Sequence, residues 1–228
     1  MIRKTGHWIR DYLYLVHRHA HSVLIRKPPH HYLGHIKEGR APVVLVPGIY
    51  EKWHFLHAIA DPISRDGHPV YVLEHLGYNT RGIEESAEAV RDLIEEQELR
   101  NVIIIAHSKG GLISKQVLLQ HNSDRRVIRV IAIATPFAGS HLARVLPLKG
   151  ISELHLSSEV IRALHEEQTV NHAITSIYGI FDNHIWPNES CVLAGAENIQ
   201  VHAHGHHAIL GSPEVRRIVS EQVAKASM

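Results

Sequence analysis

The chain has 228 residues, of which 44% are hydrophobic and 21% are charged, and its formal net charge is +1. This length and composition suit one ordinary globular domain, and the balanced charge gives no reason to expect a nucleic-acid partner. The single cysteine, Cys191, excludes an intrachain disulfide and a cysteine-based zinc cage.

The first 40 residues read as an extension that precedes a catalytic domain at 41–228. Residues 1–27 mix apolar and basic side chains in an amphipathic pattern, which the Pro28–Pro29 pair closes. Such a segment lies on a membrane surface, or docks on the protein body or on a second subunit in a homodimer. Docking on protein is favoured, because amphipathic helices usually pack on protein.

The amino-terminal stretch contains no continuous apolar run as long as a signal peptide or a membrane span. We therefore expect a cytoplasmic or peripheral membrane protein. Secretion stays open as an alternative, because a protein without disulfides can also be secreted.

From residue 41 onward, short β-branched runs alternate with helical patterns, which predicts βαβ units and a parallel sheet. Strands are expected at 43–46, 70–73, 102–106, 127–134, 174–179 and 199–201. Helices are expected at 53–63, 83–94, 110–119, 159–167 and 212–223. Residues 140–172 leave room for a short cap only. The pattern predicts an α/β fold with a mostly parallel central sheet, helices on both faces and a short or absent lid.

The most informative stretch is VIIIAHSKGG, residues 102–111, in which an apolar strand runs into a turn that carries Ser108. A serine hydroxyl is a weak nucleophile at neutral pH unless a base takes its proton. A strand–turn–helix elbow lifts the hydroxyl above the sheet edge, and small residues on either side permit the strained turn. Ala106 and Gly110 are small enough, although Ala106 departs from the first glycine of G-x-S-x-G. This context predicts a nucleophile at Ser108 rather than an incidental turn serine.

At these residues the chain resembles the small bacterial lipases and esterases of the α/β-hydrolase superfamily, several of which carry A-H-S-x-G-G at the elbow. The resemblance extends over residues 43–223 and implies the α/β-hydrolase fold and the hydrolysis of a small-molecule or lipid ester without a cofactor. VLVPGIY, residues 44–50, matches the turn that supplies a backbone N–H to the family's oxyanion hole. The resemblance implies Ile49 and Lys109 as the two donors, with Pro47 where the family often has histidine.

The acid and then the histidine follow the nucleophile along the chain in this fold. Asp182 comes directly after the strand expected to end at residue 179, and this position favours it as the acid. The base lies in HAHGHHAIL, where the family often reads G-H-x-[GA]-[LI]-L, and this spacing selects His206 over His207. The carboxylates set aside are Glu189 and Glu197.

A last motif of this resemblance is TPFAGS, residues 135–140, which is common after the strand that follows the elbow helix in lipase-like hydrolases. It implies a wall of the acyl pocket, with Phe137 as a candidate lining residue. His107 and Tyr50 are further candidates for contact with the substrate.

Two other classes of function compete with this interpretation. The stretch HAHGHH and the 22 histidines of the chain suggest a metal hydrolase, since HAHGHH is similar to the H-x-H-x-D-H ligands of metallo-β-lactamase-like enzymes. However, Gly205 stands where that family needs aspartate, so we expect no catalytic metal. A non-catalytic binding module typically loses the nucleophile or the base, whereas this chain keeps both.

Overall fold

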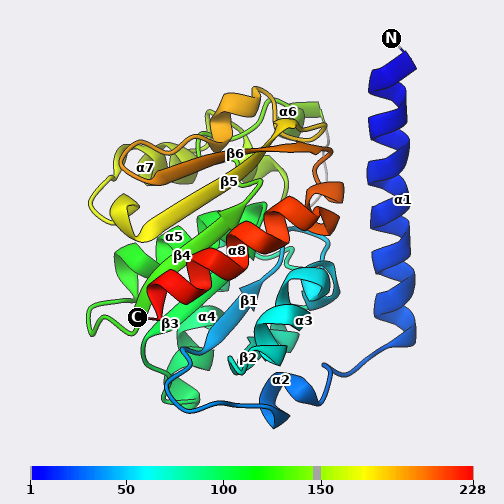
Figure 1. The fold of residues 1–228 in the computed structure, drawn as a ribbon. Helices are drawn as coiled ribbons and strands as arrows, with labels where there is room; N and C mark the ends of the chain where they lie inside the picture. Colours follow the sequence, from blue (N-terminus) through cyan, green and yellow to red (C-terminus); the bar gives the residue numbers. More distant parts are fainter. Residues whose placement is uncertain (1, 146–149, 228) are drawn as a thin grey trace.

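The computed structural model describes residues 2–145 and 150–227 (Figure 1). Within these ranges, six strands form one parallel sheet with the order β2-β1-β3-β4-β5-β6. The strands are β1 (Val43–Val46), β2 (Val70–Val72), β3 (Val102–His107), β4 (Val127–Ile133), β5 (Ile174–Phe181) and β6 (Glu197–His204). The predicted fold class, an α/β fold with a mostly parallel sheet, is confirmed.

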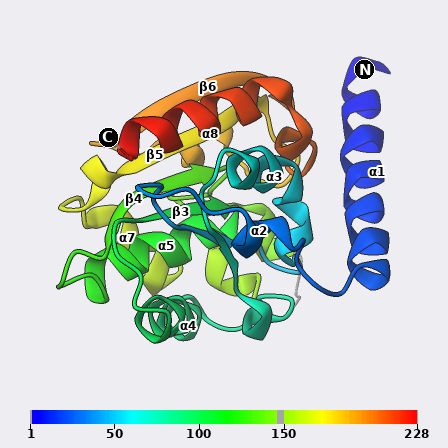
Figure 2. The same cartoon turned by 60° about the horizontal axis from the view of Figure 1, so that its bottom comes forward.

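Helices cover both faces of the sheet. They are α1 (Ile2–Leu24), α2 (His31–Gly34), α3 (His57–Arg65), α4 (Ile83–Glu96), α5 (Lys109–Gln120), α6 (Leu142–Val145), α7 (Glu159–Glu166) and α8 (Pro213–Ala226). Helices α3 and α8 pack on one face, and α4, α5 and α7 pack on the other (Figure 2). This arrangement makes three layers with a core on each side of the sheet.

The central strand β3 is buried along its whole length because it carries an apolar side chain toward each layer. Ile103 and Ile105 pack with the α3 and α8 side, whereas Val102 and Ile104 pack with the α4 and α5 side. Strands covered on both faces have near-continuous apolar runs, and each such side chain contributes about 1.5–3 kcal/mol when it is fully buried. The sequence of β3 therefore fixes it at the centre of the sheet.

Most element boundaries lie within a few residues of those expected from the sequence. Strand β6 is longer than the predicted 199–201. It lies at the edge of the sheet, where its exposed side chains alternate with buried or half-buried ones, so it contains no long apolar run. The helix expected from residue 53 begins as a short 3₁₀ turn, Trp53–Phe55, before α3. In the predicted cap, a 3₁₀ turn, Ser152–Leu154, lies between α6 and α7, and residues 146–149 fall outside the described residues.

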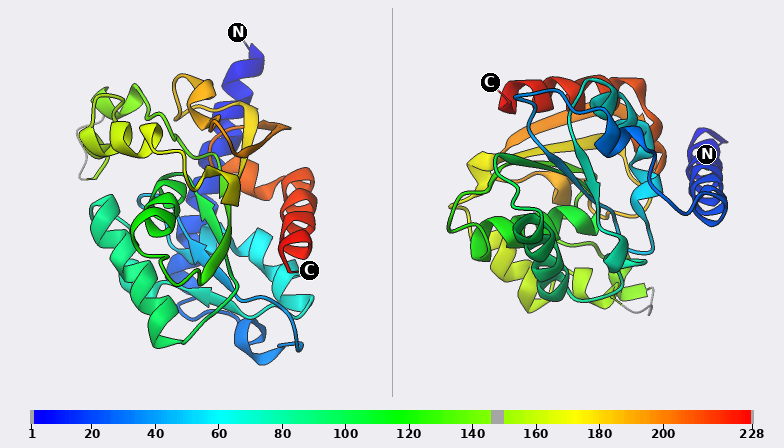
Figure 3. Two further views of the ribbon diagram at one scale, coloured as in Figure 1. Left: turned by 90° about the vertical axis from the view of Figure 1, so that its left-hand side faces the viewer. Right: turned by 90° about the horizontal axis from the view of Figure 1, so that it is seen from below.

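Helix α1 lies beside the three layers rather than within them, as the views in Figure 3 show. It contacts the 3₁₀ turns Trp53–Phe55 and Ala208–Gly211, which flank the carboxyl edge of the sheet. No helix in the described part of the chain is both long and apolar enough to cross a bilayer. The division into an extension at 1–40 and a catalytic domain at 41–228 stays a prediction.

Candidate active site

Four of the residues singled out in the sequence follow four different strands. Ile49 follows β1, Ser108 follows β3, Asp182 follows β5 and His206 follows β6. Because the strands are parallel, the loops after their carboxyl ends meet at one edge of the sheet, where ligands bind in open α/β sheets. The fold thus gathers residues that are far apart in the sequence.

Ser108 stands in a sharp turn between β3 and α5. Its φ of 53° lies in the left-handed region, where a residue other than glycine stores about 1–3 kcal/mol of strain. A Cβ on Gly110 would lie 2.1 Å from the carbonyl oxygen of Val46, and one on Gly111 would lie 2.1 Å from Thr135 Oγ1. The two glycines therefore let α5 start close enough to the neighbouring strands to form the elbow.

Ser108, His206 and Asp182 form a continuous hydrogen-bonded chain. The Ser108 hydroxyl lies 2.9 Å from His206 Nε2, and His206 Nδ1 lies 2.8 Å from Asp182 Oδ2. Each of the three side chains is at most 6% exposed. In this geometry Nδ1–H donates to the carboxylate, and Nε2 is free to accept the proton of the hydroxyl.

The surroundings of Asp182 and His206 shift the pKa values of both groups in the direction that favours this tautomer. Burial by itself would raise the pKa of Asp182, but the charge and hydrogen bond of His206 and the amides of His184 and Ile185 lower it. Burial would lower the pKa of His206, but Asp182, and further away Glu51 and Asp11, raise it above its ordinary value. The carboxylate stays ionised and favours the imidazolium that forms when His206 takes a proton.

The turn after β1 presents Ile49 beside Ser108. Asn79 Nδ2 donates to the carbonyl oxygen of Pro47 at 2.8 Å, and the amide of Tyr50 donates to the carbonyl oxygen of Tyr78 at 2.7 Å. No described residue accepts a hydrogen bond from the amides of Ile49 or Lys109. Lys109 is also the first residue of α5, where backbone N–H groups have no partner within the helix. Both amides thus lack a hydrogen-bond acceptor among the described residues, and their role as oxyanion donors stays a prediction.

A cavity of about 70 Å³ opens at Ser108 and His206. Its wall is mostly aliphatic, with polar groups near the nucleophile. The other lining residues are Ile49, Pro136, Ser140, Leu142, Ala143, Ile151, Leu154, His184 and Ile185. The aliphatic wall suits an uncharged, apolar part of a ligand.

Three residues expected to contact the substrate do not line this cavity. Phe137 is buried in the core on the α4 and α5 side, and Tyr50 lies half-buried in the turn after β1. His107 is fully buried, with Nδ1 at 2.9 Å from Glu51 Oε2 and Nε2 at 2.9 Å from the carbonyl oxygen of His206. Contact between these residues and a substrate stays a prediction.

Two buried carboxylates in this region were not anticipated from the sequence. Glu51 accepts hydrogen bonds from the amide of Gly48 at 2.7 Å and from His107. Although burial would raise the pKa of Glu51, the charge and hydrogen bond of His107 lead the effects that lower it to about 2. Asp11 reaches the loop of His206 from α1. The one available signal was that Asp11 is the sole acidic residue in 1–27.

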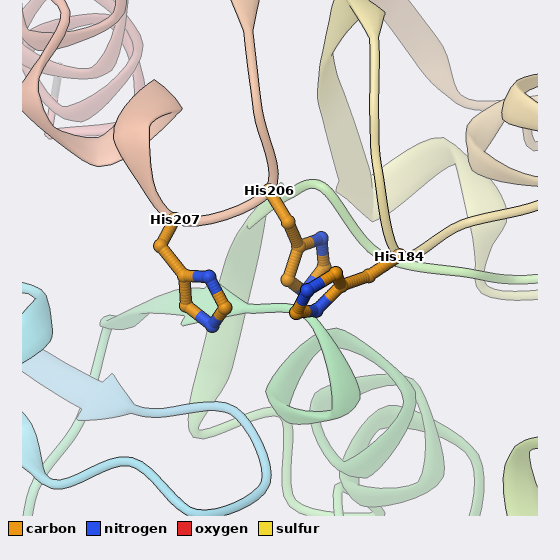
Figure 4. A group of neighbouring side chains, drawn as sticks. All are labelled: His184, His206 and His207. Carbon is orange, nitrogen blue, oxygen red and sulfur yellow. The ribbon is translucent and has the colours of Figure 1, made fainter. Parts of the chain in front are cut away.

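His184, His206 and His207 form a cluster of imidazoles beside the nucleophile (Figure 4). One nitrogen from each ring lies within 4.8 Å of the others, which is close enough to consider a metal ion. However, the rings of His184 and His206 stack with centroids 4.9 Å apart, and His206 Nε2 is already engaged by Ser108. Burial and the neighbouring imidazoles lower the pKa of His184 to about 3, so this ring stays neutral. The expectation that the cluster holds no catalytic metal stays a prediction.

A family model for the alpha/beta hydrolase fold matches residues 41–153. Comparison with curated proteins gives no match to this chain. The solved structures that resemble the chain include a lipase from Bacillus licheniformis in its mature form, with a TM-score of 0.66 and 16% identity over 84% of this chain and 95% of that one. An esterase from Thermogutta terrifontis has a TM-score of 0.57 and 15% identity over 82% and 91% of the two chains.

An alpha/beta hydrolase from the metagenome of lagoon sediments at Mar Chica, Morocco, has a TM-score of 0.61 and 16% identity. It covers 83% of this chain and 93% of its own length. At such identities the likeness establishes the fold. The family match ends at residue 153, before Asp182 and His206, so the candidate site rests on the geometry described above.

Proposed function

The chain is an α/β-hydrolase-fold protein, and on this premise we propose that it hydrolyses carboxylic esters through Ser108, His206 and Asp182. The observation that carries the proposal is the 2.9 Å contact between Ser108 Oγ and His206 Nε2 at the end of an aliphatic cavity. A hydroxyl within hydrogen-bond reach of a base that a third group orients is the arrangement that nucleophilic catalysis requires.

In the first half of the reaction, His206 Nε2 takes the proton of Ser108 as Oγ attacks the ester carbonyl carbon. The carbonyl oxygen becomes an oxyanion, which accepts hydrogen bonds from the amides of Ile49 and Lys109. The tetrahedral intermediate then breaks its bond to the alcohol oxygen, and the imidazolium gives that oxygen its proton. The alcohol leaves, and the acyl group stays on Ser108 as an ester.

In the second half, His206 removes a proton from water, and the water oxygen attacks the acyl carbon. The bond to Ser108 Oγ breaks and His206 returns the proton to the serine, which releases the carboxylic acid. Asp182 holds the imidazole in one tautomer and stabilises its cation in both halves. Two oxyanion donors contribute about 3 kcal/mol each to the transition state.

The cavity wall and the structural relatives support the proposed substrate class. Five leucine and isoleucine side chains, those of Ile49, Leu142, Ile151, Leu154 and Ile185, favour an acyl chain over a charged group. Structural relatives described as a lipase and an esterase act on esters by their names, which supports the same bond here. The alternatives for the same residues are hydrolysis of a thioester, an amide or a polyester, and transfer of the acyl group to an alcohol.

The test is the hydrolysis of p-nitrophenyl esters from acetate to palmitate by the wild type and Ser108→Ala. We expect the wild type to hydrolyse part of the series and the variant to fall to the buffer rate, with an unchanged circular dichroism spectrum. Hydrolysis by Ser108→Ala at the wild-type rate contradicts the mechanism. Inactivity of the wild type on every ester, but activity on a thioester or an amide, contradicts the ester assignment alone.

A further inference from the structure

The inner face of α1 places a carboxylate against the loop that carries His206. Asp11 is fully buried, and its Oδ1 accepts hydrogen bonds from the backbone amides of His207 at 2.6 Å and Ala208 at 2.8 Å. Its Oδ2 accepts from Asn183 Nδ2 at 3.0 Å and from His207 Nδ1 at 3.1 Å. Burial alone would raise the pKa of Asp11, but the hydrogen bond and charge of His207 and the other donors hold it well below its ordinary value.

Asn183 extends this contact to His206. It follows Asp182 in the chain, and its Oδ1 accepts a hydrogen bond from the backbone amide of His206 at 2.8 Å. A Cβ on Gly205, whose φ is +98°, would lie 2.7 Å from Asp11 Oδ1. The loop and the carboxylate are therefore packed too closely for a side chain between them. Asp11 is not among the residues that line the described cavity, so its influence passes through this loop.

We propose that Asp11 is a positioning residue, which holds the loop of His206 from α1 so that the imidazole stays aligned with Ser108 and Asp182. This inference rests on the proposed function. Misplacement of reacting groups by about 1 Å can lower a rate by about 100-fold. Loss of these hydrogen bonds should therefore lower kcat, whereas KM should change little because the aliphatic wall of the cavity comes from other segments of the chain.

Asp11→Asn tests the hydrogen bonds between Asp11 and the loop of His206, because it changes the charge at nearly constant side-chain size. The new amide can still accept from His207 and Ala208, but its own donor group faces the donor of Asn183. We expect kcat for a p-nitrophenyl ester to fall by about tenfold or more, with KM within about twofold of the wild type. Asp61→Asn removes a partly exposed carboxylate that pairs with Arg65, and it should keep the wild-type kcat.

Asp11→Asn combined with Asn183→Asp exchanges the two roles. The amide at position 11 then donates to the carboxylate at 183, which still accepts from the backbone amide of His206. This double variant should recover most of the lost kcat, which a general loss of stability would not explain. Wild-type kcat in Asp11→Asn, or no recovery in the double variant at an equal melting temperature, overturns the proposal. Absence of hydrolysis that depends on Ser108 in the wild type would instead overturn the proposed function.

The outer face of α1 carries an independent feature, a stripe of apolar side chains. Their spacings, chiefly of three, four and seven residues, place them along one side of the helix. Their exposed fractions run from 44% at Tyr12 to 81% at Leu24. The stripe consists of Ile9, Tyr12, Leu13, Val16, Val23 and Leu24. The buried or half-buried side of α1 is mostly polar or aromatic, so the usual orientation of an amphipathic helix on a protein is reversed.

Charge indicates what covers this stripe. Residues 1–27 contain six lysines and arginines, and their one carboxylate, Asp11, is buried. Arg10, Arg26 and Lys27 are exposed. A second copy of α1 would bring like charges together, because neither helix offers an exposed carboxylate. An anionic lipid surface supplies both the apolar interior and the opposite charge.

We infer that the outer face of α1 binds the surface of an anionic lipid bilayer. The ring centroid of Tyr12 lies 6.1 Å from that of His184, which lines the cavity, so one edge of the stripe adjoins the candidate active site. A helix lying in the interface would bring the cavity close to the lipid. This inference does not depend on the chemistry of Ser108, since binding is measured without turnover.

The test is sedimentation with vesicles of phosphatidylcholine alone or mixed with phosphatidylglycerol. The wild type should bind the mixed vesicles, and added salt should weaken the binding. Leu13→Ser, Val16→Ser and Val23→Ser together should lower the partition coefficient at least about tenfold. A matched triple variant, with Ile128, Ile180 and Val192 changed to serine, removes exposed apolar side chains elsewhere and should bind like the wild type.

Two outcomes contradict lipid binding. One is equal partitioning of the α1 variant and the wild type. The other is a wild type that ignores vesicles and has a dimer mass by light scattering, which the α1 variant loses. The second result would assign the stripe to an interface between copies of this chain. Because removal of residues 1–27 would also remove Asp11, substitutions on the outer face separate the two roles of α1 where truncation would not.

Discussion

At the scale of single residues, the candidate site gathers ionised carboxylates in a buried place. Asp182, Glu51 and Asp11 are each at most 6% exposed, and each accepts hydrogen bonds from at least one backbone amide and one imidazole. A buried charge without partners would cost many kcal/mol, so these donors are needed for the carboxylates to stay ionised. The same charges hold the pKa of His206 above its ordinary value.

The raised pKa of His206 predicts the acid side of the pH profile. The reaction needs the neutral imidazole, so activity should fall as the pH decreases through the pKa of His206. Because that pKa is raised from 6.5, the midpoint in kcat/KM should lie above 6.5. The measurement is kcat/KM for a neutral ester between pH 5 and 9. A single midpoint clearly below 6.5 would show that the surrounding carboxylates do not act on His206 as described.

Lys115 in α5 allows a stability prediction outside the site. It is fully buried, and no described residue offers its Nζ a hydrogen bond. Burial lowers its pKa from 10.5 to about 8, which corresponds to about 3 kcal/mol between its protonation states. Lys115→Met should therefore stabilise the protein at pH 7, by about 2–3 kcal/mol in urea unfolding.

The gap between wild type and Lys115→Met should narrow as the pH rises from about 8 to 10.5. In that range the folded state has lost the proton that the unfolded state still binds, so the stability of the wild type increases with pH. Lys27→Met, at an exposed lysine, is the control and should change stability little. A destabilised Lys115→Met protein at pH 7 would mean that Nζ has a partner in solution.

Some residues of the site could be predicted from the sequence, and others could not. Asp182 and His206 were selected by their positions after strands and by family spacing, and the structure brings both to Ser108. Asp11 and Glu51 belong to no local motif. Their importance comes from contacts across 196 and 56 positions of the chain, which no periodicity reveals. The functional roles of all four residues stay predictions.

At the scale of elements, the elbow depends on the close approach of α5 to β1. The Cβ of Gly110→Ala would lie only 2.1 Å from the backbone carbonyl oxygen of Val46. Backbone atoms in a sheet cannot move aside without a large loss of stability. We expect the free energy of unfolding to fall by about 2–4 kcal/mol. We also expect the variant protein that remains folded to be less active than the wild type. Gly34→Ala in α2 meets no atom within 4 Å and should be nearly neutral. Similar stability of the two variants would contradict the described packing.

Elements with a clear pattern were predicted well. Strands β1 and β3 are buried apolar runs, and their positions match those expected. The 3₁₀ turns and the full length of β6 were missed, because short turns have no periodic signature and an edge strand depends on pairing with β5. The sequence could not predict which face of α1 contacts the protein, because an amphipathic pattern does not say whether the apolar or the polar face packs on the body.

At the scale of the whole molecule, the parallel sheet is what assembles the chemistry. Ile49, Ser108, Asp182 and His206 come from loops after four strands, and the carboxyl edge brings them together. Asp11 adds a fifth segment, from a helix outside the three layers. The order of Ser108, Asp182 and His206 along the chain is the order that nucleophile, acid and base have in the α/β-hydrolase fold.

An activated Ser108 should react covalently with a fluorophosphonate, which reports on the nucleophile without a substrate. The folded wild type is incubated with a fluorophosphonate, and intact mass and peptide mapping locate the adduct. We expect one adduct per chain, on Ser108, and none on a Ser108→Ala variant of equal melting temperature. An unmodified Ser108 in the folded wild type, or a single adduct at another residue, would show that Ser108 is not an activated nucleophile.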